Sequence, residues 1–160
     1  MNIEQARFNM VEQQIRTWEV LDQDILDEGG LGGRGCDLEL NGSLQEPVGE
    51  TAHLVGLQGA DAVFLDCVEC NATVRATART GQRLPAHCTA GGKAQLAALP
   101  RARVLELLPD EALEGLTPES TRSRTELLRE LDRIRATGHA TNRRESEPDV
   151  HAVAAAIVDE

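Results

Sequence analysis

Aromatic side chains are scarce in this sequence: Phe8, Trp18 and Phe64 are the only ones among 160 residues, and there is no tyrosine. Proteins that bind single-stranded nucleic acid stack the bases on aromatic rings, so that class is not expected. Basic residues are also in the minority, with 16 lysines and arginines against 27 acids and a formal net charge of −11. Because this charge repels phosphate backbones and anionic lipids, we expect no direct binding to nucleic acid or membranes.

Long apolar runs are lacking as well. The longest, residues 152–158, falls far short of the about 20 residues of a membrane helix, and the charges within residues 1–20 argue against a secretory signal. Four cysteines do not suggest a disulfide framework, which favours the reducing cytoplasm. The spacing of Cys67 and Cys70, with His87 and Cys88, leaves structural zinc open as an alternative. Residues three apart in a strand face opposite ways, so we expect ordinary thiols, no metal and no cofactor.

The N-terminal segment differs from the rest of the chain in its apolar spacing and its glycine content. Residues 3–27 carry apolar side chains three, four or seven positions apart, which predicts an amphipathic helix. These side chains are Phe8, Val11, Ile15, Trp18 and Ile25. Five glycines then fall within residues 28–36, the composition of a flexible joint. We therefore predict an N-terminal helix over residues 1–27, a glycine-rich linker over residues 28–43 and a domain over residues 44–160.

Within that domain the pattern first predicts strands. The segments "TAHLVGLQ" and "AVFLDCVE" read as a hairpin with Gly59 in its turn, and "ATVRATA" alternates as a further strand. The segment "VHAVAAAIV" at residues 150–158 is typical of a buried strand. Between them lie two predicted helices. This order predicts an α+β fold with an antiparallel sheet flanked by helices.

The two helices have clear boundaries. One runs from about Ala90 to Leu99 and stops at Pro100. The other follows the capping box of Ser123 and Glu126 and ends before Gly138. Its apolar positions are Leu127, Leu128, Leu131 and Ile134.

The first helix opens with "HCTAGGK", which is not a phosphate loop. A G-x-x-x-x-G-K-[ST] motif would need glycine at His87 and a hydroxyl at Ala94. Thr89 is instead a plausible N-cap, so the first helix amides, from Ala90 to Gly92, could favour a bound carboxylate. The alternative is that the glycines serve only close packing of the helix. We expect Lys93 to point to solvent, and the acids around Glu145 to form a solvated turn.

Four segments together resemble a known family. They are "GETAHLVGLQGADAVFLDCVE", "GQRLPAHCTAGGKAQLAALP", "LTPESTRSRTELLRELDRIRATGHA" and "VAAAIVDE". In this order they look like the effector-binding domain of IclR-type transcriptional regulators, over about residues 44–160. The resemblance implies a GAF-like, non-catalytic domain that senses a small organic acid or aromatic molecule and that could form a homo-oligomer. In that family a separate winged helix binds DNA.

The resemblance also implies the positions of an effector pocket. They are Thr73, Ala76, Leu84, Ala90, Gly91, Asn142 and Ala152. Asn142 stands where the family has an acid, and His151 where it usually has arginine. Because several of these side chains are small, the expected pocket is wide and weakly polar.

The two ends of the sequence give further expectations. Residues 1–27 resemble the first helix of bacterial protein-L-isoaspartate O-methyltransferases, with Thr17 in place of a usual proline. Gly30, Gly32 and Gly35 satisfy G-x-G-x-x-G, but no buried strand precedes them and no helix pattern follows. Compared with typical members of that family, this sequence lacks the winged helix and the final strand with its C-terminal helix. We therefore expect a truncated effector domain. A methyltransferase fragment and a chimeric or decayed reading frame without activity remain the alternatives.

Overall fold

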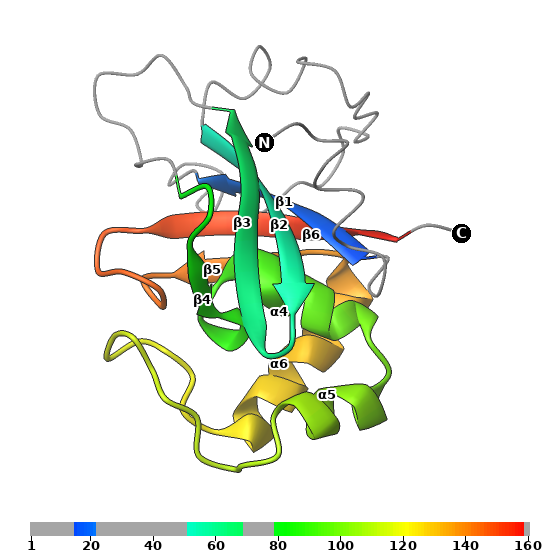
Figure 1. The fold of residues 1–160 in the computed structure, drawn as a ribbon. Helices are drawn as coiled ribbons and strands as arrows, with labels where there is room; N and C mark the ends of the chain where they lie inside the picture. Colours follow the sequence, from blue (N-terminus) through cyan, green and yellow to red (C-terminus); the bar gives the residue numbers. More distant parts are fainter. Residues whose placement is uncertain (1–14, 22–50, 69–78, 159–160) are drawn as a thin grey trace.

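The computed structural model describes residues 15–21, 51–68 and 79–158, in which one six-stranded antiparallel sheet carries helices on one face (Figure 1). The strands lie in the order β4-β3-β2-β1-β6-β5. Their bounds are β1 Ile15–Leu21, β2 Thr51–Gln58, β3 Asp61–Val68, β4 Arg83–Pro85, β5 Ala140–Arg143 and β6 His151–Val158. The helices are α4 Ala90–Ala98, α5 Arg101–Leu107 and α6 Arg124–Thr137, with a short 3-10 turn at Ala86–Cys88. The α+β class and antiparallel sheet predicted from the sequence are confirmed.

The predicted hairpin is confirmed as β2 and β3. Gly59 has a φ of +62°, a left-handed conformation that glycine adopts without the steric cost of a Cβ, and Gln58 pairs with Asp61 across the turn. The pairing of the two strands shifts by one residue between Leu54 and Val55. The predicted strand over residues 72–78 and the linker over residues 28–43 lie outside the described residues.

The N-terminal helix prediction is wrong where the structure can be compared with it. Residues 15–21 form strand β1, which pairs antiparallel with both β2 and β6. This stretch, "IRTWEVL", is rich in β-branched and aromatic residues that suit a strand. A helical spacing of apolar residues is only a weak preference for a helix. Here the backbone hydrogen bonds to two neighbouring strands override it. Residues 1–14 and 22–27 of the predicted helix lie outside the described residues.

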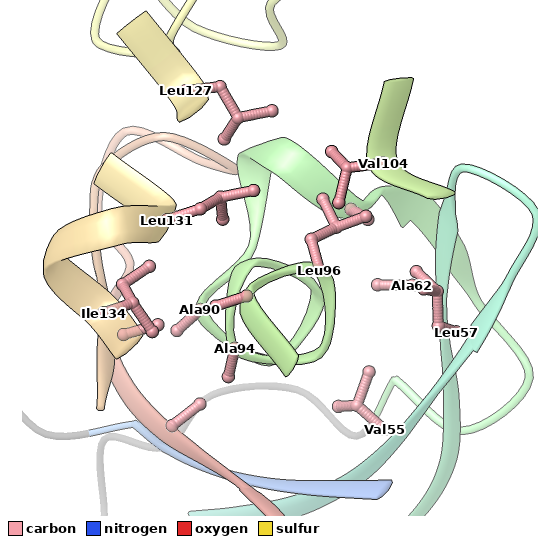
Figure 2. Packing of buried hydrophobic residues seen from close by; sticks show 14 of the residues in the cluster. Val55, Leu57, Ala62, Ala90, Ala94, Leu96, Val104, Leu127, Leu131 and Ile134 are labelled. Carbon is pink, nitrogen blue, oxygen red and sulfur yellow. The ribbon is translucent and has the colours of Figure 1, made fainter. Parts of the chain in front are cut away.

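Helix α4 lies between the sheet and α6, and the apolar core surrounds it (Figure 2). The core joins β2, β3, β6 and all three helices. From the helices it takes Ala90, Ala94, Leu96, Ala97, Val104, Leu127, Leu128, Leu131 and Ile134. All four apolar positions predicted for α6 are therefore buried. Gly138 ends α6 in the left-handed conformation, with a φ of +79°.

Strand β4, the 3-10 turn at Ala86–Cys88, helix α5 and strand β5 were not predicted from the sequence. Helix α5 begins directly after Pro100, whose fixed φ suits the residue before a helix, and buries only Val104. Strand β5 pairs with the predicted last strand, β6, over four residue pairs from Ala140↔Ala154 to Arg143↔His151. The turn between β5 and β6 includes Arg144, a non-glycine residue with a φ of +64°.

Candidate functional site

The start of α4 is built around its cap. Thr89 Oγ1 accepts a hydrogen bond of 3.0 Å from the Gly92 amide, which confirms Thr89 as the N-cap. A Cβ on Gly92 would lie 2.7 Å from Thr89 Oγ1 and closer still to the Ala86 backbone. Glycine at position 92 therefore lets α4 pack directly on the 3-10 turn. Its amide serves the cap, so close packing, rather than a bound carboxylate, accounts for this glycine.

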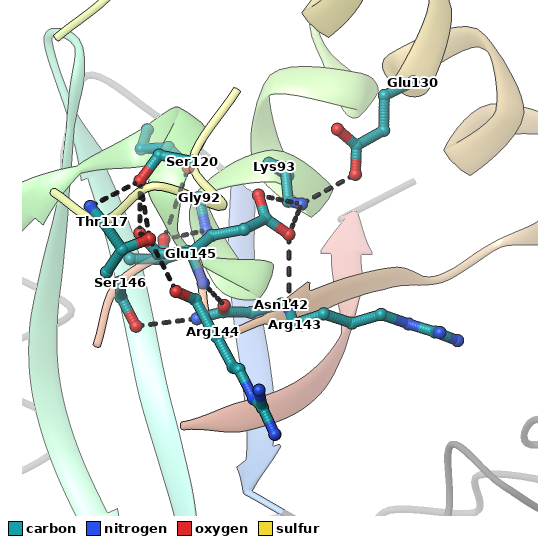
Figure 3. A network of polar contacts seen from close by, with 12 residues as sticks. Gly92, Lys93, Thr117, Ser120, Glu130, Asn142, Arg143, Arg144, Glu145 and Ser146 are labelled. Atoms are coloured by element: carbon teal, nitrogen blue, oxygen red, sulfur yellow. Dashed lines mark hydrogen bonds and ion pairs between the residues drawn. The ribbon is translucent and has the colours of Figure 1, made fainter. Parts of the chain in front are cut away.

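Lys93 does not point to solvent, contrary to expectation. It is fully buried, and its Nζ lies 2.7 Å from Glu130 Oε1 on α6 and 2.7 Å from both carboxylate oxygens of Glu145 (Figure 3). A buried ammonium is costly unless it is paired. The ion pairs therefore fix α4 to α6 and to the β5–β6 turn.

The turn after β5 is not a solvated acidic turn at Glu145, which is only 8% exposed. The Glu145 amide donates to Asn142 Oδ1 at 2.8 Å, and Asn142 Nδ2 donates to Ser146 Oγ at 2.8 Å. Burial raises the pKa of the Glu145 carboxyl, and the Lys93 ammonium offsets part of that effect. Asn142, where the family resemblance places an acid, thus shapes the turn that carries Glu145.

Side chains of the segment "LTPES", residues 116–120, donate hydrogen bonds to the backbone of the same turn. Ser120 Oγ donates to the Glu145 carbonyl at 2.6 Å and accepts from the Thr117 amide at 2.9 Å. Thr117 Oγ1 donates to the Arg144 carbonyl at 2.7 Å. These bonds hold Arg144 in its left-handed conformation, which L-residues rarely adopt. We call Lys93, Thr117, Ser120, Glu130, Asn142 and Glu145 the Lys93 cluster (Figure 3).

Five of the seven predicted pocket residues lie in the described parts of the chain, in β4, α4, β5 and β6. Ala90 and Ala152 are both fully buried members of one apolar cluster, against which the half-buried Leu84 packs. Asn142 is the register partner of Ala152 between β5 and β6. Gly91 is buried in the first turn of α4. The remaining two positions, Thr73 and Ala76, lie outside the described residues.

A buried histidine was missed from the sequence. His53 is fully buried in β2, with its ring 5.3 Å from that of Phe64 in an edge-on arrangement, and Arg79 lies over the Phe64 ring. Burial, helped by the Arg79 charge, lowers the pKa of His53 to about 4. Neither ring nitrogen has a hydrogen-bond partner among the described residues. Strand alternation, which puts His53 on the same face as Val55, was the signal that could have found it.

The alternatives based on metal or membrane find no support in the described parts of the chain. There, no three His, Cys, Asp or Glu residues converge as metal ligands, and Cys70 of the C-x-x-C pair lies outside these parts. None of the helices described has the length and apolar content needed to cross a bilayer.

Comparisons with known proteins place this fold and these residues in a family. The family model described as "Bacterial transcriptional regulator IclR C-terminal" matches residues 41–160. The HTH-type transcriptional repressor AllR of Klebsiella pneumoniae is 32% identical over 112 residues, which are 70% of this chain and 41% of AllR. The chain thus spans less than half the length of this curated relative.

Solved structures agree with that match. The crystal structure of Thermotoga maritima IclR is 30% identical, with a TM-score of 0.59 over 69% of this chain and 51% of that one. The inducer-binding domain of PobR from Acinetobacter, solved with 3-hydroxybenzoic acid, is 23% identical, with a TM-score of 0.54 over 68% of this chain and 73% of that one; it shares the fold. The chain belongs to the IclR family, whose C-terminal effector-binding domain it carries over residues 41–160.

Proposed function

We propose that this chain senses a small organic acid or aromatic molecule in the cytoplasm, without catalysing a reaction. The effector would bind on the α4 side of the sheet, at the predicted pocket positions. The observation that supports this proposal is that Ala90 and Ala152 are fully buried in the apolar core around α4, with Leu84 packed against that core and Asn142 paired with Ala152. These residues come from two parts of the sequence, β4 with α4 and β5 with β6.

The chemistry of these positions suits a small, mostly apolar ligand. Ala90, Gly91 and Ala152 contribute little side-chain volume next to the sheet, and Leu84 adds an apolar surface. Among the described residues, Asn142 donates one amide hydrogen to Ser146 Oγ and accepts one hydrogen bond from the Glu145 amide, and a carboxamide has a second hydrogen and a second lone pair to offer. It could therefore orient a carboxylate or hydroxyl group without breaking the turn.

Regulation would act through contact with partner subunits, either copies of this chain or other proteins. The formal net charge of −11 disfavours DNA contact by the chain itself. Binding next to Asn142 would reach α4 and α6 through the Lys93 cluster, since Glu145 connects the β5–β6 turn to Lys93. A gel-shift titration should accordingly show no salt-sensitive DNA binding by this chain.

The proposal is tested with a panel of small aliphatic and aromatic acids. A ligand that binds only the native state must raise the melting temperature of the full chain. Ala152→Val should weaken binding of any acid that gives a rise, because its added methyl groups would occupy ligand space. Ala156→Val, the same change four residues along the same strand, should leave affinity unchanged in calorimetry. The proposal fails if no acid raises the melting temperature, or if both variants weaken binding equally.

The regulator interpretation is favoured over the methyltransferase alternative by the family match over residues 41–160. Gly30, Gly32 and Gly35 lie outside the described residues. A calorimetric titration with S-adenosylmethionine should show no binding, and micromolar affinity would restore the enzyme alternative.

A further inference from the structure

The central strand of the sheet lies outside the family match. Strand β1, residues 15–21, sits between β2 and β6, whereas the match covers residues 41–160. Every residue from Arg16 to Val20 has a register partner on both sides, from Gly56 to Ala52 on β2 and from Ile157 to Val153 on β6. A segment with no counterpart in the family match thus completes the sheet that the matched residues build.

The place that β1 fills is defined by matched residues alone. Neighbouring strands lie about 4.8 Å apart, so β2 and β6 are about 10 Å apart, too far to pair with each other. Helix α4 contacts both of them, and Val55 of β2 and Ala154 of β6 join one apolar cluster with Leu96 of α4. The helix therefore spans the space between the two strands from one face. Without β1, both strands would present an unpaired backbone edge towards the same space.

Two facing edges bind an extended segment better than one does. A peptide that adds to a sheet usually gains hydrogen bonds along one edge. Here a strand running antiparallel to both neighbours gains a ladder on each side. Unpaired edges left open would also template pairing with other chains, which proteins ordinarily avoid by covering them.

We propose that the facing edges of β2 and β6 form a strand-binding slot and that residues 15–21 fill it as an internal, displaceable ligand. The occupant is this chain's own segment, "IRTWEVL", and an extended peptide of the same sequence should bind in trans when the internal copy is withdrawn. None of the proposed effector positions lies in β1; Ala152 lies in β6, one residue before the stretch that pairs with β1.

The first test uses the unmodified full chain. Trp18 is its single tryptophan and lies in β1, and the sequence has no tyrosine, so intrinsic fluorescence reports on this segment. Urea unfolding followed by Trp18 fluorescence and by far-ultraviolet circular dichroism should give coincident transitions. A fluorescence signal without a cooperative transition, or one whose midpoint lies well below that of the helices, would overturn the proposal.

The second test withdraws the internal strand. Thr17→Pro removes a backbone N–H and places proline in a central strand, where it is not tolerated, whereas Thr17→Val keeps the ladder. A fluorescein-labelled peptide of residues 11–25 should bind the full-length Thr17→Pro chain at least 10-fold more tightly than it binds the wild-type or Thr17→Val chain, measured by anisotropy. The same peptide carrying the proline should bind none of them.

Each outcome decides for or against the slot. If Thr17→Pro unfolds alone, the peptide should restore its far-ultraviolet circular dichroism, and the Trp18 test stands independently. Absence of peptide binding and of restored structure would overturn the proposal. Equal affinity of the peptide for all three chains, or of both peptides for Thr17→Pro, would do the same.

Discussion

Helices α4 and α6 are adjacent, yet polar side chains are buried in α4 and mostly exposed in α6. In α6 the buried side chains are Leu127, Leu128, Leu131 and Ile134, and the charged residues lie mostly toward solvent. In α4 every residue from Ala90 to Ala97 is buried, including Lys93 and Gln95. Helix α6 covers the core from one side, whereas α4 passes through the middle of it (Figure 2).

The difference shows where a polar residue must find a partner. Lys93 is neutralised by Glu145 and Glu130, and Gln95 Nε2 donates to the Val55 carbonyl at 2.9 Å. An apolar side chain in α6 is stabilised by leaving water, whatever its exact neighbours. Polar side chains in α4 depend on specific partners distant in sequence, although Gln95 Oε1 has none among the described residues. Four predictions test this contrast, from the largest effect to the smallest.

Removing the buried charge of α4 should cost most. Lys93→Met keeps the side-chain length but leaves Glu145 without its counter-ion, which should lower the free energy of unfolding by about 4 kcal/mol in urea titrations. Arg133→Met, on the exposed face of α6, is the matched control and should change it by less than about 0.5 kcal/mol. Similar losses in both variants would remove the contrast between the helices. Glu145→Gln added to Lys93→Met should recover part of the loss.

Truncating the buried face of α6 comes next. Leu131 is fully buried, so Leu131→Ala should lose about 3 kcal/mol through lost apolar burial and a residual cavity. The urea dependence of the free energy should stay unchanged. A loss below about 1 kcal/mol would mean that α6 is packed less tightly than the structure indicates.

A buried polar group without a partner should make stability depend on pH. The pKa of His53 is about 4 in the folded protein against 6.5 for an exposed histidine, so the unfolded chain binds the proton more readily. Stability from this group is complete above pH 6.5 and is lost as the pH falls towards 4, by up to about 3 kcal/mol. His53→Leu cannot be protonated, so its pH profile should be flatter by that amount. Parallel profiles for the two proteins would contradict the assignment.

Removing the helix caps should give the smallest effects, and it compares the two helices directly. Thr89 caps α4 and is fully buried, whereas Ser123 caps α6 near the surface. Thr89→Ala should cost about 2 kcal/mol and Ser123→Ala about 1 kcal/mol, because water can replace only the exposed cap. Thermal unfolding of both variants measures the difference. Equal losses would show that burial of the cap adds nothing.

The sequence predicted what depends on neighbours along the chain. The β2–β3 hairpin follows from alternation and Gly59, and α6 follows from its capping residue, its apolar spacing and Gly138. For the candidate site, resemblance indicated Ala90, Asn142 and Ala152; Ala90 and Ala152 lie in the apolar core, and Asn142 pairs with Ala152. Whether they bind an effector remains a prediction.

What depended on distant partners was not predictable. Lys93 looks like a surface lysine until Glu145 is brought against it, and Glu145 looks like part of a solvated turn until Ser120 covers its backbone. Likewise, residues 15–21 combine a composition that suits a strand with a helical spacing of apolar residues, and pairing with β2 and β6 decides between the two. The local pattern of "IRTWEVL" fits either structure.

The position of β1 also sets an order of events during synthesis. Ile15 pairs with Val158, so the ladder between β1 and β6 joins residues that are far apart in the sequence. On the ribosome, β2, β3 and β4 can assemble as they emerge, but β1 waits for its second partner until residues 151–158 have been made. Contacts so distant in sequence form slowly and leave strand edges open meanwhile. Production of this protein should therefore depend on chaperones that shield a half-built sheet.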